Sequence, residues 1–168
     1  ILAQQSGHIP MPTRRGFEDH IEDALSLTKA LNYLQNAIQL LQGSNDHVTH
    51  LHAQLLLTWV SLELYDYVTA LHTARAGLTL PMDAALVQNC ASELAALYCH
   101  SSEALALLND ITGASQALLG SAAEQQVNIL LESLESKPVT GPCALHYALQ
   151  LDDSSALSPV LTNLAILC

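Results

Sequence analysis

Three histidines, His47, His50 and His52, lie close together in the chain and are the first candidates for metal chemistry. His47 and His50 are three residues apart, which places both on one side of a helix, and imidazole is a common zinc ligand. No glutamate follows in the His-Glu-x-x-His arrangement of zinc enzymes, and no third ligand stands nearby in the required spacing. We therefore expect a polar turn with Asp46 as a helix N-cap, and no metal or other cofactor.

The cysteines are the second candidate for chemistry. Cys99 and His100 are adjacent, but neighbouring residues on a helix point in different directions, so we do not expect a catalytic Cys–His dyad. With Cys90, Cys143 and Cys168, the chain has no Cys-x-x-Cys pair and no regular disulfide framework. This pattern predicts buried, reduced thiols in an intracellular protein.

Other enzyme signatures do not occur in the sequence. There is no Gly-x-Ser-x-Gly elbow, no phosphate-binding glycine-rich loop and no dinucleotide fingerprint. Glu18, Asp19, Glu22 and Asp23 form an acidic cluster, but they lie in the first turns of an expected helix, where carboxylates favour the helix dipole. We expect neither catalytic residues nor enzymatic activity.

The charge balance narrows the choice of partners. Five Lys and Arg residues against sixteen Asp and Glu residues give a net charge of −11. Nucleic-acid binding requires a basic surface that neutralises phosphates, and attraction to an anionic membrane requires basic clusters. We therefore expect protein partners, without direct nucleic-acid contact and without a membrane.

Composition and apolar spacing predict an all-α fold. Half of the residues are hydrophobic, yet aromatic residues make up only 4%, so leucine and alanine must fill the core. Few segments alternate polar and apolar side chains, so strands are not expected. The predicted segments are an extended arm at 1–16, helical repeats at 17–135, a loop at 136–142 and a truncated helical hairpin at 143–168. The arm is either disordered or lies along a neighbouring surface.

Within these segments, apolar spacing and helix stop signals predict the individual helices. They are expected at 17–42, 51–64, 66–80, 83–109, 114–135 with a candidate interruption at 120–121, and 144–151, followed by a last helix with Pro159 in its first turn. The apolar face of the first helix is expected to consist of Ile21, Leu25, Leu31, Leu34, Ile38 and Leu41.

The clearest pattern is the pair of helices from Leu51 to Pro81, separated by a turn too short for anything but antiparallel packing. Ala70, Ala74 and Gly77 place short side chains on one face of the second helix, and Trp59 of the first helix is expected to be partly buried. The order of apolar helix, Asp-Tyr-x-x-Ala-Leu, small residues and proline resembles the tetratricopeptide (TPR) repeat, a helical hairpin of about 34 residues that stacks into a superhelix.

Two registers compete for the next repeat. Ala104-Leu105 lies one repeat length beyond Ala70-Leu71, which would place a turn near His100-Ser101-Ser102. Those residues include no Gly or Pro, and the apolar spacing continues through them. The sequence therefore favours one long helix from Asp83 to Asn109.

A closer resemblance appears in LLLTWVSLELYDYVTALHTARAGLTLP, in ASELAALYCHSSEALALLND and in PVLTNLA near the end of the chain. These segments are similar to the TPR subunit numbered ten of the CCR–NOT mRNA deadenylase complex. The resemblance covers Leu51–Asn109 and the last ten residues, with Tyr65 where the family has a turn glycine. It implies a scaffold without catalysis, present in the cytoplasm and also in the nucleus. Its partners would be subunit eleven and the N-terminal region of the central NOT scaffold.

The alternative is a TPR adaptor that captures short peptides, such as the C-terminus of a chaperone, with basic side chains. The candidates for that clamp are Arg14, Arg15, Lys29, Arg75 and Lys137, of which only Arg75 lies in the clear repeat. For the scaffold, we expect contacts at the ends of the helical array, because neither end carries the polar capping helix that a solenoid needs and no following helix covers the last one. Another chain, or parts of a longer protein to which this chain belongs, would cover at least one of these ends. The candidate partner-binding residues are Leu161, Leu164, Leu167, Ile21 and Leu25.

Overall fold

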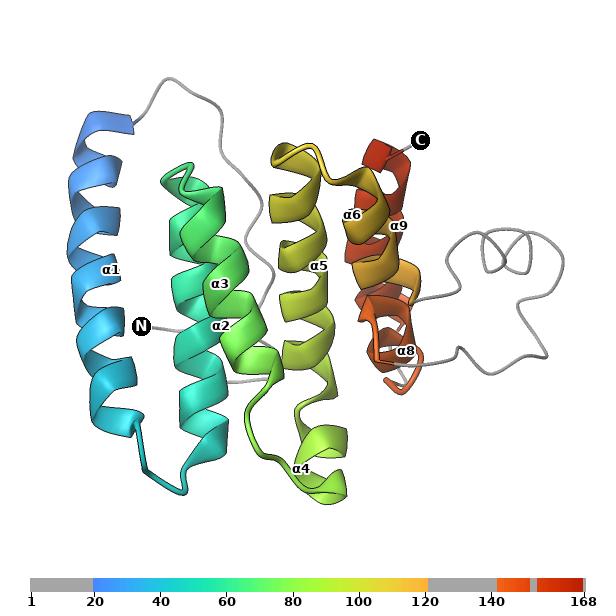
Figure 1. The fold of residues 1–168 in the computed structure, drawn as a ribbon, viewed down its shortest axis with the longest axis horizontal. Helices are drawn as coiled ribbons and strands as arrows, with labels where there is room; N and C mark the ends of the chain where they lie inside the picture. The colour runs from blue at the N-terminus through green and yellow to red at the C-terminus, as the bar shows by residue number, and fades with distance from the viewer. Residues whose placement is uncertain (1–19, 121–141, 152–153, 168) are drawn as a thin grey trace, which may run out of the picture.

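The computed structural model describes residues 20–120, 142–151 and 154–167, and within these ranges it contains helices and no strands. Figure 1 shows the main helices side by side in a row, with α1 (His20–Leu41) at one end and α6, α8 and α9 at the other. The predicted all-α class is confirmed. The predicted arm 1–16 and most of the loop 136–142 lie outside the described residues.

The first helix agrees with the sequence prediction, whereas the second begins at His47, four residues before the predicted start at 51, so the predicted polar turn at 47–52 is wrong. α1 ends at Leu41, before the predicted Gly43-Ser44-Asn45 stop, and α2 spans His47–Glu63. Asp46 is the N-cap of α2, since its side chain accepts the Thr49 N–H at 3.0 Å. This contact satisfies one of the amide groups that the first turn of a helix leaves without a partner.

A tight turn joins α2 to α3 (Tyr67–Leu78) and makes them antiparallel neighbours. Tyr65 has a positive φ of 61° at the end of α2. The Tyr65 N–H donates to the Leu62 carbonyl at 3.0 Å, and the Asp66 N–H donates to the Ser61 carbonyl at 2.9 Å. These bonds form a Schellman motif. The Asp66 side chain then caps α3 by accepting the Thr69 N–H at 3.1 Å, so one residue ends the first helix and starts the second.

The small residues of α3 allow three helices to meet. Ala70 and Ala74 have no exposed surface, as the sequence pattern predicted. At Gly77, an added Cβ would lie 2.9 Å from the Leu97 side chain and 3.1 Å from the Gln54 Cβ. Leu97 belongs to α5 and Gln54 to α2, so α3 packs tightly against both. Trp59 of α2 is half-buried, which confirms that part of the prediction.

The predicted long helix 83–109 is wrong in one respect. Asp83 caps it as expected, with its side chain accepting the Leu86 N–H at 2.8 Å. The helix then breaks at Cys90 into α4 (Ala84–Asn89) and α5 (Ala91–Leu107). α4 has no buried residue, whereas Cys90 and Ala91 are buried, so the break lets α5 enter the core while α4 stays at the surface. Asn89 and Cys90 are weak helix formers, but neither is a strong stop signal.

The turn between α5 and α6 (Ile111–Leu119) repeats the α2–α3 turn. Asn109 has a φ of 64°, and the Asp110 N–H donates to the Leu105 carbonyl at 2.8 Å. Asp110 caps α6 by accepting the Gly113 N–H at 2.9 Å. α5 runs without interruption through His100-Ser101-Ser102, so the longer helix was the correct choice there and the 34-residue register is wrong. The expected helix 114–135 starts earlier, at Ile111, and α6 ends at Leu119 with Gly120 as its C-cap. The described residues stop at 120 and resume at 142.

The last helices close the core around α5. α8 spans Ala144–Ala148, shorter than predicted, and α9 spans Leu157–Leu167 with Pro159 in its first turn as expected. A 3₁₀ turn at Ser154–Ala156 precedes α9. The main core cluster takes side chains from α2, α3, α5, α6, α8 and α9, and α5 contacts every one of these helices.

We expect Ala74→Leu to lower the free energy of unfolding by about 1–3 kcal/mol, because the larger side chain overpacks the contact of α3 with its neighbours. Ala85→Leu is the matched control, since Ala85 is exposed on α4, and it should change stability by less than about 0.5 kcal/mol. Urea unfolding followed by circular dichroism gives both values. Equal stability of the two variants would contradict the close packing of α3.

The turn geometry can be tested at Asn109. Asn109→Val should lower the free energy of unfolding by about 1–2 kcal/mol, because a β-branched residue is strained at positive φ. Asn109→Gly, which adopts this conformation without strain, should remain within about 0.5 kcal/mol of the wild type. Thermal unfolding measures the stability of both variants. An Asn109→Val variant as stable as the wild type would show that the turn does not need a positive φ.

Candidate functional site

The three histidines near the start of α2 have different neighbours. His50 Nε2 lies 3.3 Å from Gln54 Nε2, one turn further along α2. His52 contacts α5 through Glu93, and the buried Nδ1 of His47 has no hydrogen-bond partner in the described part of the chain. No group of three or more metal-ligating side chains gathers within residues 20–120, 142–151 and 154–167.

Glu93 is a buried carboxylate that the sequence analysis did not single out. It is 7% exposed at the start of α5. Its Oε1 lies 3.1 Å from His52 Nε2, and its Oε2 accepts the Ser92 hydroxyl at 2.7 Å. A buried carboxylate is costly unless such hydrogen bonds compensate for lost water. The contact joins α2 to α5, and His52 is the side that solvent reaches, with 38% of its side chain exposed.

Cys99 and His100 face different neighbours on α5. The Cys99 thiol is buried in the main core cluster. Burial raises the pKa of Cys99 to about 12, so the thiol stays protonated near neutral pH. The His100 ring points to Glu103, with 4.0 Å between His100 Nδ1 and Glu103 Oε2. A thiol with so high a pKa is a poor nucleophile because the thiolate is the reactive form.

This burial has a measurable consequence. At pH 8, iodoacetamide should alkylate Cys99 about a thousandfold more slowly in the folded protein than in guanidinium, from the thiolate fraction alone. Peptide mapping by mass spectrometry over a time course measures the rate at this cysteine. Alkylation of Cys99 at the unfolded rate in native buffer would contradict its position in the core.

The outer face of α1 carries large apolar side chains. Leu25, Tyr33 and Leu40 are 61%, 76% and 85% exposed. Their spacing of eight and seven residues brings them to one side of the helix. Leu25 was expected on one apolar face with Leu31 and Leu34, and that assignment is wrong, because Leu25 is exposed and Leu27 is half-buried instead. Leu25 was also named as a partner-binding residue, which stays a prediction. Ile21 belongs to α1, but its side chain lies outside the described part.

At the opposite end, the predicted residues of α9 divide between two environments. Leu161 is 53% exposed, as expected for a partner-binding position. Leu164 and Leu167 are half-buried and pack against the main core cluster. They are therefore covered in large part by this chain, contrary to the expectation that nothing covers them. Ile166, which the sequence analysis did not select, is 70% exposed.

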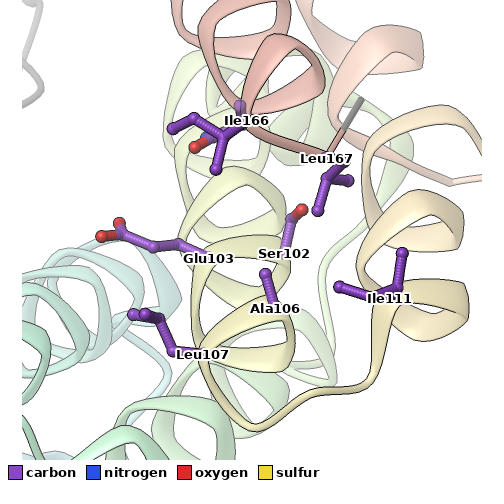
Figure 2. A pocket seen from close by; sticks show the side chains of 8 residues that line it. Ser102, Glu103, Ala106, Leu107, Ile111, Ile166 and Leu167 are labelled. Atoms are coloured by element: carbon purple, nitrogen blue, oxygen red, sulfur yellow. The ribbon is translucent and has the colours of Figure 1, made fainter.

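A pocket of about 270 Å³ lies between α5, α6 and α9. Figure 2 shows Ala106 and Ser102 of α5 at its floor, Ile111 of α6 on one side, and Ile166 and Leu167 of α9 above them. Leu107 and the carboxylate of Glu103 stand at the side opposite Ile111. The sequence held a weak signal for this site, since Ser102, Glu103 and Ala106 share a helical face. The partners on α6 and α9 come from tertiary packing.

Comparisons with protein-family models, with curated proteins and with solved structures gave no match. Among the described helices, none has the length and apolar character of a bilayer span. The similarity to TPR repeats and to the CCR–NOT subunit therefore remains a prediction from the sequence.

Proposed function

We propose that this chain is a non-catalytic helical scaffold whose end surfaces are covered by other protein chains. The observation that carries the proposal is the outer face of α1, formed by Leu25, Tyr33 and Leu40. Isolated apolar residues at a surface are common, but a row of large ones on one helix face marks an interaction site.

The inner face of α1 strengthens this argument. Leu27, Leu34 and Leu41 face α2 but are only half-buried, so α1 presents apolar side chains on both of its sides. A helix that ends a helical array in water normally has a polar outer face. α1 therefore has the character of an internal helix, and a partner packed on its outer face would complete its burial.

The finer part of the proposal is a TPR-like solenoid that serves as the tenth subunit of a CCR–NOT deadenylase. Support for the repeat comes from the two hairpins, α2–α3 and α5–α6, which share a positive-φ residue followed by a capping aspartate. The assignment to mRNA decay, with subunit eleven and the central NOT scaffold as partners in the cytoplasm and nucleus, rests on the sequence resemblance.

The basic clamp of a peptide-capturing TPR module receives less support. Lys29 and Arg75 are the lysine and arginine residues within the described ranges, and they lie on α1 and α3. α3 packs on α2 and α5, whereas α1 packs on α2. A clamp for a terminal carboxylate needs several convergent cations, so we favour the scaffold.

The scaffold proposal predicts that residues 1–168, purified alone, self-associate in a concentration-dependent manner. Tyr33→Lys combined with Leu40→Glu should increase the monomer fraction, because it adds charge to an exposed apolar face while leaving the core intact. Leu149→Glu is the matched control, since Leu149 is similarly apolar and half-exposed but lies after α8. Size-exclusion chromatography with light scattering gives the masses.

Co-expression tests the proposed partners. Subunit eleven and the N-terminal region of the NOT scaffold should convert the wild-type chain into a single complex, and the Tyr33→Lys/Leu40→Glu variant should lose that complex. A wild-type chain that stays monomeric at high concentration without any partner would count decisively against the scaffold.

A further inference from the structure

The pocket between α5, α6 and α9 has apolar walls that solvent reaches. Leu107, Ile111 and Ile166 are each exposed by 44% or more, although they come from three different helices. Their side chains border one hollow, as Figure 2 shows. By contrast, Ser102 at the floor is buried, so the hollow reaches down to the packed part of α5. Three exposed aliphatic side chains around one depression form a site that an apolar group can fill.

The size of the pocket selects the kind of group. Its volume of about 270 Å³ lies near the lower limit of the range of about 300–1,000 Å³ that is typical of small-molecule and cofactor sites. A hollow of this size suits one large side chain of a protein partner. Interfaces concentrate binding energy in such places, where an anchor residue enters a pocket and excludes water.

The charge around the pocket favours a basic residue next to the apolar anchor of the partner. From position 84 onward, the described residues contain no lysine or arginine, whereas Glu93, Glu103 and Asp110 carry carboxylates. Glu103 stands on the rim with 26% of its side chain exposed. A basic side chain that reaches this rim meets an attractive field, and an acidic one is repelled.

We infer that this pocket holds one large apolar side chain of a partner protein, and that a lysine or arginine next to this anchor pairs with Glu103. The inference deepens the proposed scaffold function by assigning a second docking point, on the opposite end of the helix row from α1. The expected partner is a basic segment of another protein.

Isoleucine methyl groups provide a direct readout. The chain has few isoleucines, and Ile111 and Ile166 both line the pocket while Ile38 lies on α1. We would label the Ile δ1 methyl groups with ¹³C in the full chain carrying Tyr33→Lys/Leu40→Glu, which leaves the pocket unchanged. Three alanine-rich helical peptides are titrated: one with Phe and Arg four residues apart, one with Ala replacing Phe, and one with Glu replacing Arg.

The expected result is a saturable shift of the Ile111 and Ile166 signals with the Phe/Arg peptide, while Ile38 stays in place. Replacing Phe by Ala should abolish the shift, and replacing Arg by Glu should weaken binding at least about tenfold. Glu103→Gln should reduce the preference for Arg over Glu, and Ala106→Trp should block binding by filling the pocket. Leu149→Ser, at an exposed apolar residue outside the pocket lining, should leave affinity unchanged.

Several outcomes would overturn the inference. Absence of saturable shifts at Ile111 and Ile166 would show that the pocket does not bind a large apolar side chain. Equal affinity for the Arg and Glu peptides would show that it does not prefer a basic partner. Shifts that follow the concentration of the chain itself assign the pocket to a second copy. Loss of binding by Ala106→Trp counts only if its circular dichroism spectrum matches that of the parent chain. Ile111→Ala is the second variant that tests the pocket wall. If the peptides do not bind at the pocket but the complex still forms through α1, the inference about the pocket is wrong and the scaffold proposal is unaffected.

Discussion

The close approach of α2, α3 and α5 at Gly77 is the constraint on which the rest of the structure depends. Leu97 and Gln54 occupy the space that a Cβ at this position would need, so the three helices can meet only around a residue without a side chain. Ala70 and Ala74 extend this contact along the same face of α3. Because α5 is fixed there, it can contact α6, α8 and α9 on its other sides, and these helices form the walls of the α5–α6–α9 pocket.

The two hairpin turns show how a sequence with little glycine builds the same turn twice. Tyr65 and Asn109 accept a left-handed conformation that favours glycine, and each is followed by an aspartate that caps the next helix. Two backbone hydrogen bonds and one side-chain cap fix the direction of each second helix. The strain at one residue is thereby offset by three polar contacts, and the α2–α3 and α5–α6 turns share the same geometry.

The sequence predicted those parts of the fold that depend on local chemistry. Asp46 and Asp83 precede helices, and the small residues of α3 mark a close contact, so these features could be read from neighbouring residues. The break at Cys90 could not, because it results from the contrast between a surface helix and a buried one. The same holds for Glu93, because one of the two contacts that compensate its buried carboxylate comes from His52 of another helix. The pocket residues come from three helices, and no local pattern indicates which of them meet.

If the proposed scaffold function holds, the distribution of charge and apolar surface would give the two ends of the row different tasks. On α1, affinity must come from burial of Leu25, Tyr33 and Leu40, because Lys29 is the one charged residue among positions 25–41. Such a face binds by area and shape, and it discriminates weakly between apolar partners. The α5–α6–α9 end has less exposed apolar surface around its pocket but places Glu103 beside it. Charge contributes more to the choice of partner and to the association rate than to affinity. A scaffold that holds a partner at α1 and selects one at the pocket would therefore divide affinity and specificity between its ends.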